Sequence, residues 1–302
     1  MPNCWYTLYA ETKALSPALS PKLAYSECIS ALVVENILSE EKKMKAYKNT
    51  KFLDSPDARL LRIVSEFVEP ATRFSRNDIE DTIVFMGSAR APDSKDELET
   101  EPLPNNNIQK KHWKAMARYY QDCRELAKRM TLWSKNLPEG HRRFVVCSGG
   151  GPGIMEAANQ GASDAGGINI GLGISLPNEQ GNNPHITREL SLEFHYFFMR
   201  KFWFAYLAKA VVFFPGGFGT MDELFEILTL LQTGKIRKHL PLVLFGTDYW
   251  KRAVDFEMLI EYGTINRSDL ELFLMTDSVD VAFDYLTEQL SRYGVKEHGT
   301  TL

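Results

Sequence analysis

Two glycine-rich segments, CSGGGPGIMEAANQGA and FFPGGFGTMDELFE, each lie where an apolar run gives way to a helical pattern. Glycine allows turns with positive φ and lets backbone N–H groups approach a ligand closely. The helix that follows adds the positive end of its dipole. Together the two corners predict binding of an anion, most simply a phosphate group. A tight strand-to-helix turn in any α/β protein would explain a single corner equally well.

The residues predicted to bind the anion lie in both corners. They are Gly149, Gly150 and Gly151 in the first corner and Gly216, Gly217, Gly219 and Thr220 in the second. Neither corner follows a better-known phosphate loop. The spacing G-x-G-x-x-G fails at Ile154, and G-x-x-x-x-G-K-[ST] occurs nowhere in the chain. These absences argue against a dinucleotide oxidoreductase and a P-loop NTPase.

A carboxylate, Glu223, follows the second corner closely. If Thr220 caps the helix, TMDE is a capping box and Glu223 has a structural role. The alternative is chemical, because the helix dipole would keep a carboxylate ionised beside the proposed phosphate site. Such a group could stabilise an oxocarbenium-like state at a sugar C1′ or activate water. Asp222 and Glu226 are expected to face outward.

An arginine in the preceding segment is the second candidate. Residues 191–210 are crowded with aromatic side chains around Arg200 and Lys201, and are expected to form a core helix. The guanidinium of arginine suits a phosphate or carboxylate partner, with which it can form two parallel hydrogen bonds. Arg200 is therefore predicted to act together with Glu223.

The elements that must position these residues begin at residue 82, where short apolar runs alternate with amphipathic patterns. This alternation predicts an α/β fold with a doubly wound parallel sheet, whose ligands lie beyond the carboxyl ends of the strands. The apolar runs are TIVFMGSAR, RFVVCSGGG, INIGLGISL, AVVFFPGG and LPLVLFG, and helices are expected near 111–134, 154–166 and 249–262, from 221, and after SVDVAF.

The first part of the chain, residues 1–80, is predicted to be a helical extension, with residues 81–302 as the catalytic domain. In DSPDARLLRIVSEFVEP, Asp54 or Ser55 before Pro56 signals the start of a helix, and Pro70 is expected to end it. Residues 101–111 are expected to be a surface excursion within the second domain.

The composition of the 302 residues excludes several classes of protein. A net charge of -4 and a pI near 5.9 provide no field that attracts nucleic acid or an anionic membrane. The four cysteines show neither metal-site nor disulfide spacing, which is typical of the cytoplasm. No apolar run is long enough for a membrane span.

The second corner also resembles a known family. PGGFGTMDE matches the PGGxGTxxE motif of the LONELY GUY (LOG) family of nucleoside 5′-monophosphate phosphoribohydrolases, long mislabelled as lysine decarboxylases, and GGGPGIMEAANQGA and MRKF are similar to that family as well. The resemblance implies a Rossmann-like homodimer that hydrolyses AMP-like nucleotides to a free base and ribose 5-phosphate. It implies no metal or organic cofactor.

The resemblance also implies roles for individual residues. Glu223 matches the catalytic acidic residue, and Arg200 the arginine of the M-x-x-R-K element. Phe197 replaces the methionine of that element, which leaves the base preference open. The remaining substrate-binding candidates are Lys201, Ser88 and Glu156, beside the glycines and Thr220 of the two corners.

Two other functions compete with hydrolysis. A non-catalytic protein that carries a nucleotide or nucleotide-like cofactor could use the same corners, although Glu223 and Arg200 favour chemistry. A pyridoxal-phosphate decarboxylase needs a lysine for a Schiff base, and neither corner contains one.

Overall fold

The computed structural model describes residues 44–93, 110–137, 142–177 and 181–295. The predicted surface excursion falls almost wholly outside these ranges. The chain forms two compact units, Met1–Arg62 and Ile63–Leu302. The described part of the first unit contains three short turns, η1 (Ala46–Lys48), α3 (Thr50–Leu53) and η2 (Pro56–Ala58), and the start of α4 (Arg59–Arg76).

The described residues of the second unit contain one parallel sheet of seven strands in the order β4-β3-β2-β1-β5-β6-β7. This confirms the predicted fold class. The strands are β1 (Thr82–Met86), β2 (Val145–Ser148), β3 (Asn169–Ile174), β4 (Ser191–Phe194), β5 (Ala208–Phe213), β6 (Leu242–Phe245) and β7 (Phe273–Thr276).

The sequence patterns missed the two edge strands. β4 and β7 are short and only partly buried, whereas every residue of β1, β2, β5 and β6 is buried. Strands covered on both faces produce continuous apolar runs, and edge strands do not. The pattern therefore marked the centre of the sheet and not its borders.

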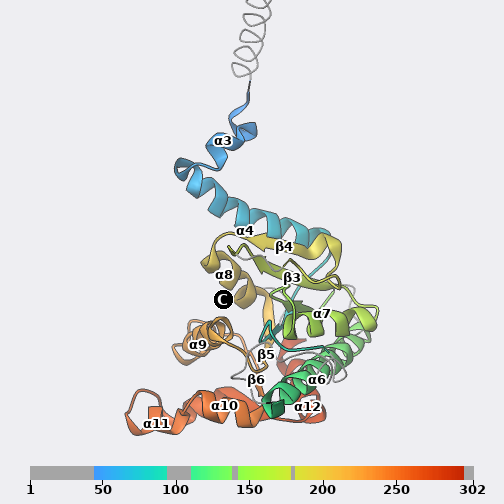
Figure 1. The fold of residues 1–302 in the computed structure, drawn as a ribbon, viewed down its shortest axis with the longest axis vertical. Coiled ribbons are helices and arrows are strands. Elements are labelled where there is room, and N and C mark those ends of the chain that lie inside the picture. Colours follow the sequence, from blue (N-terminus) through green and yellow to red (C-terminus); the bar gives the residue numbers. More distant parts are fainter. Residues whose placement is uncertain (1–43, 94–109, 138–141, 178–180, 296–302) are drawn as a thin grey trace, which may run out of the picture. The chain divides into compact units, whose positions relative to one another are not determined.

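Helices cover both faces of the sheet (Figure 1). Alternate residues of the central strands point to opposite faces, so that Val84 and Met86 belong to one apolar core and Ile83 and Phe85 to the other. One core includes residues of α4, α8 (Phe197–Leu207), α9 (Phe218–Gln232), α10 (Thr247–Ala253) and α11 (Phe256–Glu261), and the other includes residues of α6 (Lys110–Lys135), α7 (Ile154–Asp164) and α12 (Val279–Gln289). Short helical turns complete the described chain, namely η3 (Arg188–Leu190), η4 (Arg267–Leu272) and η5 (Leu290–Gly294).

Three sequence expectations about helices are wrong. Pro70 does not end its helix, because α4 continues to Arg76. The aromatic segment 191–210 is not one helix but β4, α8 and the first residues of β5. The helix expected at 249–262 is two helices, α10 and α11, separated at Val254, which has an extended backbone conformation.

The order of the strands marks one position on the sheet. From β1 the chain builds outward through β2, β3 and β4 to one edge, then returns to β5 on the other side of β1. The strand order therefore reverses between β1 and β5. Ligands of open parallel sheets bind at such reversals, beyond the carboxyl ends of the strands.

Candidate active site

Backbone hydrogen bonds join the loops after three neighbouring strands. The amide of Ser88, just after β1, donates to the carbonyl of Pro215 after β5 at 3.0 Å. The amide of Ile154, after β2, donates to the carbonyl of Ser88 at 3.0 Å. Ser88 thus lies between the two glycine corners. The structure brings together the predicted ligand-binding segments at the reversal of the strand order.

The second corner contains glycines of two kinds. A Cβ on Gly216 would lie 2.1 Å from Thr220 Oγ1 and 3.0 Å from the amide nitrogen of Ser88, so no larger residue fits without a rearrangement. A Cβ on Gly217 or Gly219 would meet no atom within 4 Å. Gly216 is therefore required by packing, whereas Gly217 and Gly219 leave the backbone uncovered on the solvent side.

The helix after this corner begins earlier than predicted. Gly217 is the N-cap of α9, with no side-chain cap bond, and Phe218 is the first helical residue. Thr220 is inside the first turn, so the capping box expected for TMDE is wrong. The structural role that competed with chemistry for Glu223 therefore disappears. The uncapped first turn also leaves amide donors for an anion.

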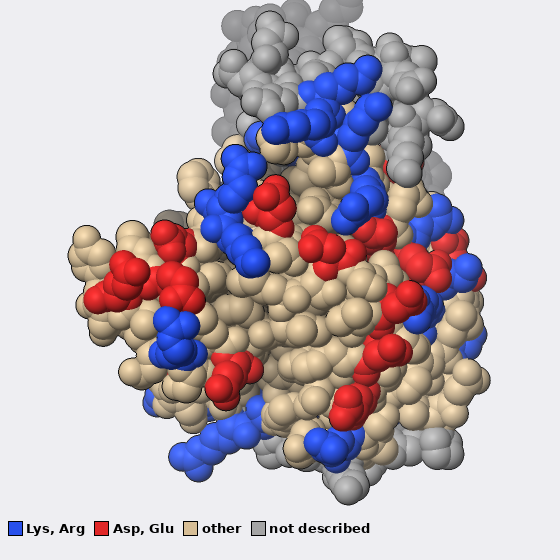
Figure 2. Space-filling view, turned by 90° about the horizontal axis from the view of Figure 1, so that it is seen from below, with Lys and Arg blue, Asp and Glu red and all other residues tan. Residues whose placement is uncertain are grey.

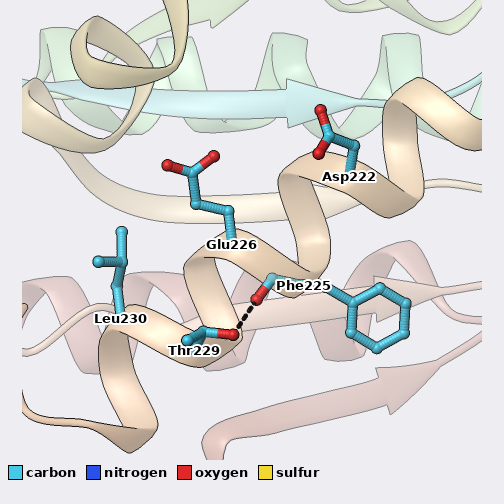
Figure 3. Close-up of a pocket in the computed structure, with 5 residues that line it drawn as sticks. All are labelled: Asp222, Phe225, Glu226, Thr229 and Leu230. Carbon is cyan, nitrogen blue, oxygen red and sulfur yellow. Dashed lines mark hydrogen bonds between the residues drawn. The ribbon is translucent and has the colours of Figure 1, made fainter. Parts of the chain in front are cut away.

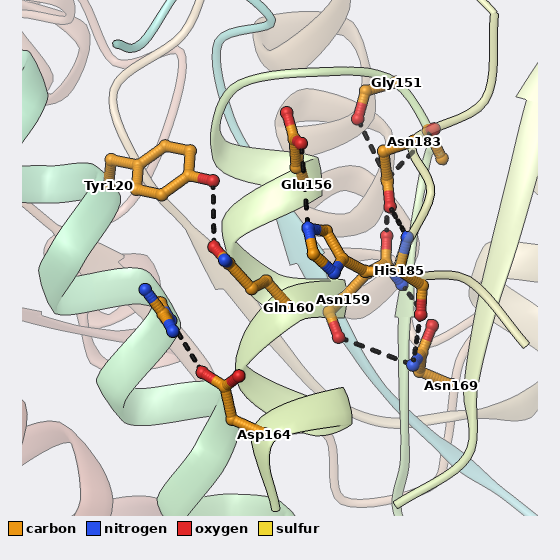
Figure 4. Close-up of polar contacts among 11 residues, drawn as sticks. Tyr120, Gly151, Glu156, Asn159, Gln160, Asp164, Asn169, Asn183 and His185 are labelled. Carbon is orange, nitrogen blue, oxygen red and sulfur yellow. Dashed lines mark hydrogen bonds and ion pairs between the residues drawn. The ribbon is translucent and has the colours of Figure 1, made fainter. Parts of the chain in front are cut away.

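The first corner is fixed by Asn183, which the sequence patterns did not single out (Figure 4). Asn183 Nδ2 donates to the carbonyls of Gly150 and Gly151, each at 3.1 Å, and the backbone amide of Asn183 donates to Gly150 at 2.8 Å. A trans peptide has its C=O and N–H on opposite sides. The amide of Gly151 is therefore turned away from Asn183.

A buried network of amide side chains supports Asn183. Asn159 lies fully buried in α7 and accepts a hydrogen bond from Asn183 at 3.0 Å and from Ser148 at 2.7 Å. Asn159 in turn donates to Asn169 at 2.9 Å. Buried polar groups require partners, and these residues provide them for one another. An asparagine on the alanine-rich face of α7 was the sequence signal for this network.

Glu156 lies in the first turn of α7, beside the first corner. One of its carboxylate oxygens is 3.9 Å from His185 Nε2, and both side chains are partly exposed (Figure 4). Among the described residues, no contact joins Glu156 to Arg200 or Glu223. Its predicted role in substrate binding thus concerns the first corner alone.

The partly buried Arg200 of α8 and the buried Glu223 of α9 form an ion pair, with Arg200 Nη2 3.7 Å from Glu223 Oε1. The guanidinium lies over the rings of Phe197 and Phe204, 5.1 and 5.6 Å from their centroids. These residues are three before and four after Arg200 and so lie on the same side of the helix. The aromatic rings therefore hold the guanidinium toward α9.

Glu223 occupies the buried face of its own helix. It shares that face with Thr220, Leu224 and Ile227, and only 5% of its surface is exposed. Burial raises the pKa of Glu223 from its ordinary value of 4.5 to about 7, against the opposing charges of Arg200 and Lys201. Burial thus opposes the ionisation that was expected from the helix dipole, and Glu223 is partly protonated near neutral pH. Burial lowers the pKa of Arg200 as well, but a guanidinium stays charged near neutral pH.

The pair has unused hydrogen-bonding capacity. Glu223 Oε1 and Arg200 Nε are buried, and neither forms a hydrogen bond with any residue in the described ranges. Buried polar atoms without a partner are rare and concentrate at functional sites. One is an acceptor and the other a donor, as recognition of a hydroxyl group requires.

Lys201, a predicted substrate-binding residue, forms ion pairs with two side chains of α9. Its ammonium group lies 2.8 Å from Asp222 Oδ1 and 2.7 Å from Glu226 Oε2, so both carboxylates of α9 neutralise it. Asp222 and Glu226 therefore do more than face solvent. Lys201 links α8 to α9, and the two carboxylates compensate the charge that a substrate phosphate would otherwise meet.

A cavity beside these carboxylates is less suited to a phosphate group than the glycine corners. It has a volume of about 470 Å³ on the outer side of α9 and is lined by Asp222, Phe225, Glu226, Thr229 and Leu230 (Figure 3). Figure 3 shows the carboxylates of Asp222 and Glu226 among the side chains that line it. Carboxylates in the lining disfavour an anion. The glycine corners, with their backbone donors, remain the better phosphate site.

The surface charge agrees with the composition. The face in Figure 2 carries both basic and acidic side chains, with basic groups gathered toward its upper part and a line of acidic groups down its right side. In the described part of the chain, no helix is long and apolar enough to cross a membrane. The same residues contain no cluster of three histidine, cysteine or acidic side chains suited to a metal ion.

Comparison with known sequences identifies relatives for the second half of the chain. Residues 155–286 match the family model described as "Possible lysine decarboxylase". Two rice proteins (Oryza sativa subsp. japonica) are described as probable cytokinin riboside 5′-monophosphate phosphoribohydrolases, LOG4 and LOGL3. Each is 29% identical over 48% of this chain, which corresponds to 62% of LOG4 and 68% of LOGL3. The chain thus spans less than two thirds of LOG4.

Solved structures are more distant. A structural-genomics target called TM1055 is 21% identical over 69% of this chain and 99% of its own, with a TM-score of 0.45. A molybdenum cofactor carrier protein from Chlamydomonas reinhardtii is 16% identical over 70% of this chain and 99% of its own, with a TM-score of 0.39. Such scores support no conclusion about function. The sequence relatives, however, confirm the resemblance to the LOG family for the segment that contains Arg200, the second corner and Glu223.

Proposed function

We propose that this protein hydrolyses the N-glycosidic bond of nucleoside 5′-monophosphates, releasing the free base and ribose 5-phosphate. The observation that carries the proposal is the ion pair of Arg200 and Glu223, in which one buried donor and one buried acceptor form no hydrogen bond with the described residues. Glu223 lies on the helix that begins in the second glycine corner. A phosphate held by that corner would present the attached ribose to the pair.

The chemistry follows from the charge that develops on the sugar. Departure of the base leaves positive charge at C1′ and the ring oxygen, and an anionic group beside them stabilises it. The ionised form of Glu223 would do this, or would accept a proton from the attacking water. A pKa of about 7 leaves part of Glu223 ionised at neutral pH. Turnover should therefore increase as the pH rises through 7.

The substrate class rests on the corners and on the relatives. Backbone amides at the corners favour an anion, so nucleoside monophosphates should be preferred to nucleosides. The rice relatives are described as acting on cytokinin riboside monophosphates, which are N6-substituted AMP. We propose AMP-like purine nucleotides as the substrates here, and a homodimer as the assembly, for which sedimentation velocity is the test.

A product assay tests the proposal. The protein is incubated with AMP, GMP, CMP and adenosine, and free base and ribose 5-phosphate are quantified. Release from a monophosphate, at least 100-fold slower in Glu223→Gln and Arg200→Ala, is expected. Glu257→Gln, which removes an exposed carboxylate from α11, is the control and should keep most of the activity.

Other outcomes identify the alternatives. Tight binding of AMP without turnover, unchanged in Glu223→Gln, would favour a carrier. Equal turnover of adenosine and AMP would refute the phosphate site. An absorbance band of bound pyridoxal phosphate would support the decarboxylase description of the family, for which neither corner provides a lysine.

A further inference from the structure

Helix α4 contains a proline whose effect reaches the arginine helix. Pro70 has no N–H, so the carbonyl four residues earlier, that of Glu66, loses its helical partner. The indole Nε1 of Trp203 in α8 donates to this carbonyl at 3.0 Å. Trp203 is buried and needs an acceptor. The unpaired carbonyl in α4 and the indole N–H in α8 thus satisfy each other, which explains why α4 continues through a proline.

The side chain of Glu66 contacts the backbone at the start of α8. The two carboxylate oxygens of Glu66 accept hydrogen bonds from the amides of His195 at 2.7 Å and Tyr196 at 3.2 Å. Tyr196 is the N-cap of α8, and its own side chain makes no cap bond. A carboxylate at the start of a helix satisfies free amides and is stabilised by the dipole. Glu66 therefore caps α8 from another helix.

Aromatic packing strengthens this attachment. The ring of Phe67 lies 5.5 Å from that of Phe202 and 5.6 Å from that of Trp203, and Phe74 meets Trp203 at 5.3 Å. In sequence, Arg200 stands between the capped residues and these aromatic residues. Helix α4 thus holds α8 on both sides of Arg200.

We propose that Glu66 is a positioning residue for Arg200, which it holds at its distance from Glu223 by capping α8. The effect on turnover rests on the proposed function, whereas the effect on α8 does not. Glu66 lies outside the matched family segment 155–286. Part of the chain that the sequence assigned to an appendage would therefore belong to the catalytic machinery.

Three variants of the full-length protein test the effect on turnover of AMP. Glu66→Ala should lower kcat per folded molecule by on the order of 10-fold and change KM less, because a small displacement of a catalytic group slows the chemical step. Glu66→Gln keeps an acceptor oxygen for one amide and should recover part of the loss. Glu69→Gln is the control, since Glu69 lies on the same helix and pairs with Arg73. A purely structural role would lower stability and leave kcat per folded molecule unchanged.

Two measurements need no turnover. Hydrogen exchange at the amides of His195 and Tyr196 should accelerate in Glu66→Ala, because their acceptor is lost. The charge of Arg200 lowers the pKa of Glu223, so displacement of Arg200 should raise that pKa, which NMR titration of the carboxyl carbon detects. The parent protein shows separately whether AMP is hydrolysed. If it does not hydrolyse AMP but both changes appear in Glu66→Ala, the proposed function fails and the positioning role stands. Unchanged exchange and an unchanged Glu223 titration in Glu66→Ala would overturn the role of Glu66.

Discussion

Replacing Glu223 with glutamine should stabilise the protein in a pH-dependent manner. Burial raises the pKa of Glu223 from 4.5 to about 7. The folded state therefore binds this proton more tightly than the unfolded chain. The stabilising contribution of the proton is complete below pH 4.5 and is lost as the pH rises through 7. Above pH 7 the buried charge destabilises the fold, and Glu223→Gln removes that charge.

The magnitude follows from the difference in pKa. A difference of about 2.5 pH units, at about 1.4 kcal/mol per unit, corresponds to about 3 kcal/mol when Glu223 is fully ionised in the folded state. The effect of Glu223→Gln on the free energy of unfolding should be more favourable at pH 8 than at pH 5 by about 2 to 3 kcal/mol. Comparing two pH values cancels the constant effects of the substitution, such as the altered contact with Arg200.

Urea unfolding of the parent and the variant at pH 5 and pH 8 provides the measurement. Glu257→Gln is the control, because it removes an exposed carboxylate from α11, away from Arg200 and Glu223, and should behave alike at both pH values. If Glu223→Gln changes the free energy of unfolding by the same amount at pH 5 and pH 8, the argument from desolvation is refuted. We expect Glu223→Gln to be more stable than the parent but inactive, because a buried charge that function requires destabilises the fold.

Three further predictions concern the neighbouring residues. Gly216→Ala should lower stability by several kcal/mol, since its Cβ would meet Thr220, whereas Gly219→Ala should leave the unfolding midpoint nearly unchanged and weaken AMP binding, measured by calorimetry. Lys201→Ala should destabilise the protein by about 1 kcal/mol or less, because two partly solvated carboxylates lose their shared partner, and 1 M salt should reduce the loss. Asn183→Ala should raise KM for AMP several-fold with a smaller effect on kcat, because it frees the carbonyls of the first corner; an unchanged KM would contradict this.

The sequence by itself determined the parallel sheet and the two glycine corners of the candidate site. Continuous apolar runs report strands buried on both faces, and glycines at their ends report turns, because both depend on local properties of the chain. The edge strands β4 and β7 were missed because they are partly exposed and therefore lack such apolar runs. The two glycine corners could therefore be located without coordinates.

Only the tertiary structure decided the ionisation and the partners of the site residues. The pKa of Glu223 depends on how much water the surrounding helices exclude, and no local pattern encodes that. Lys201 is neutralised by two residues of another helix, and the carbonyl that Pro70 frees is paired by Trp203, far along the chain. Local sequence states which groups are available, whereas their burial and their partners depend on contacts between distant segments, which exist only once the chain has folded.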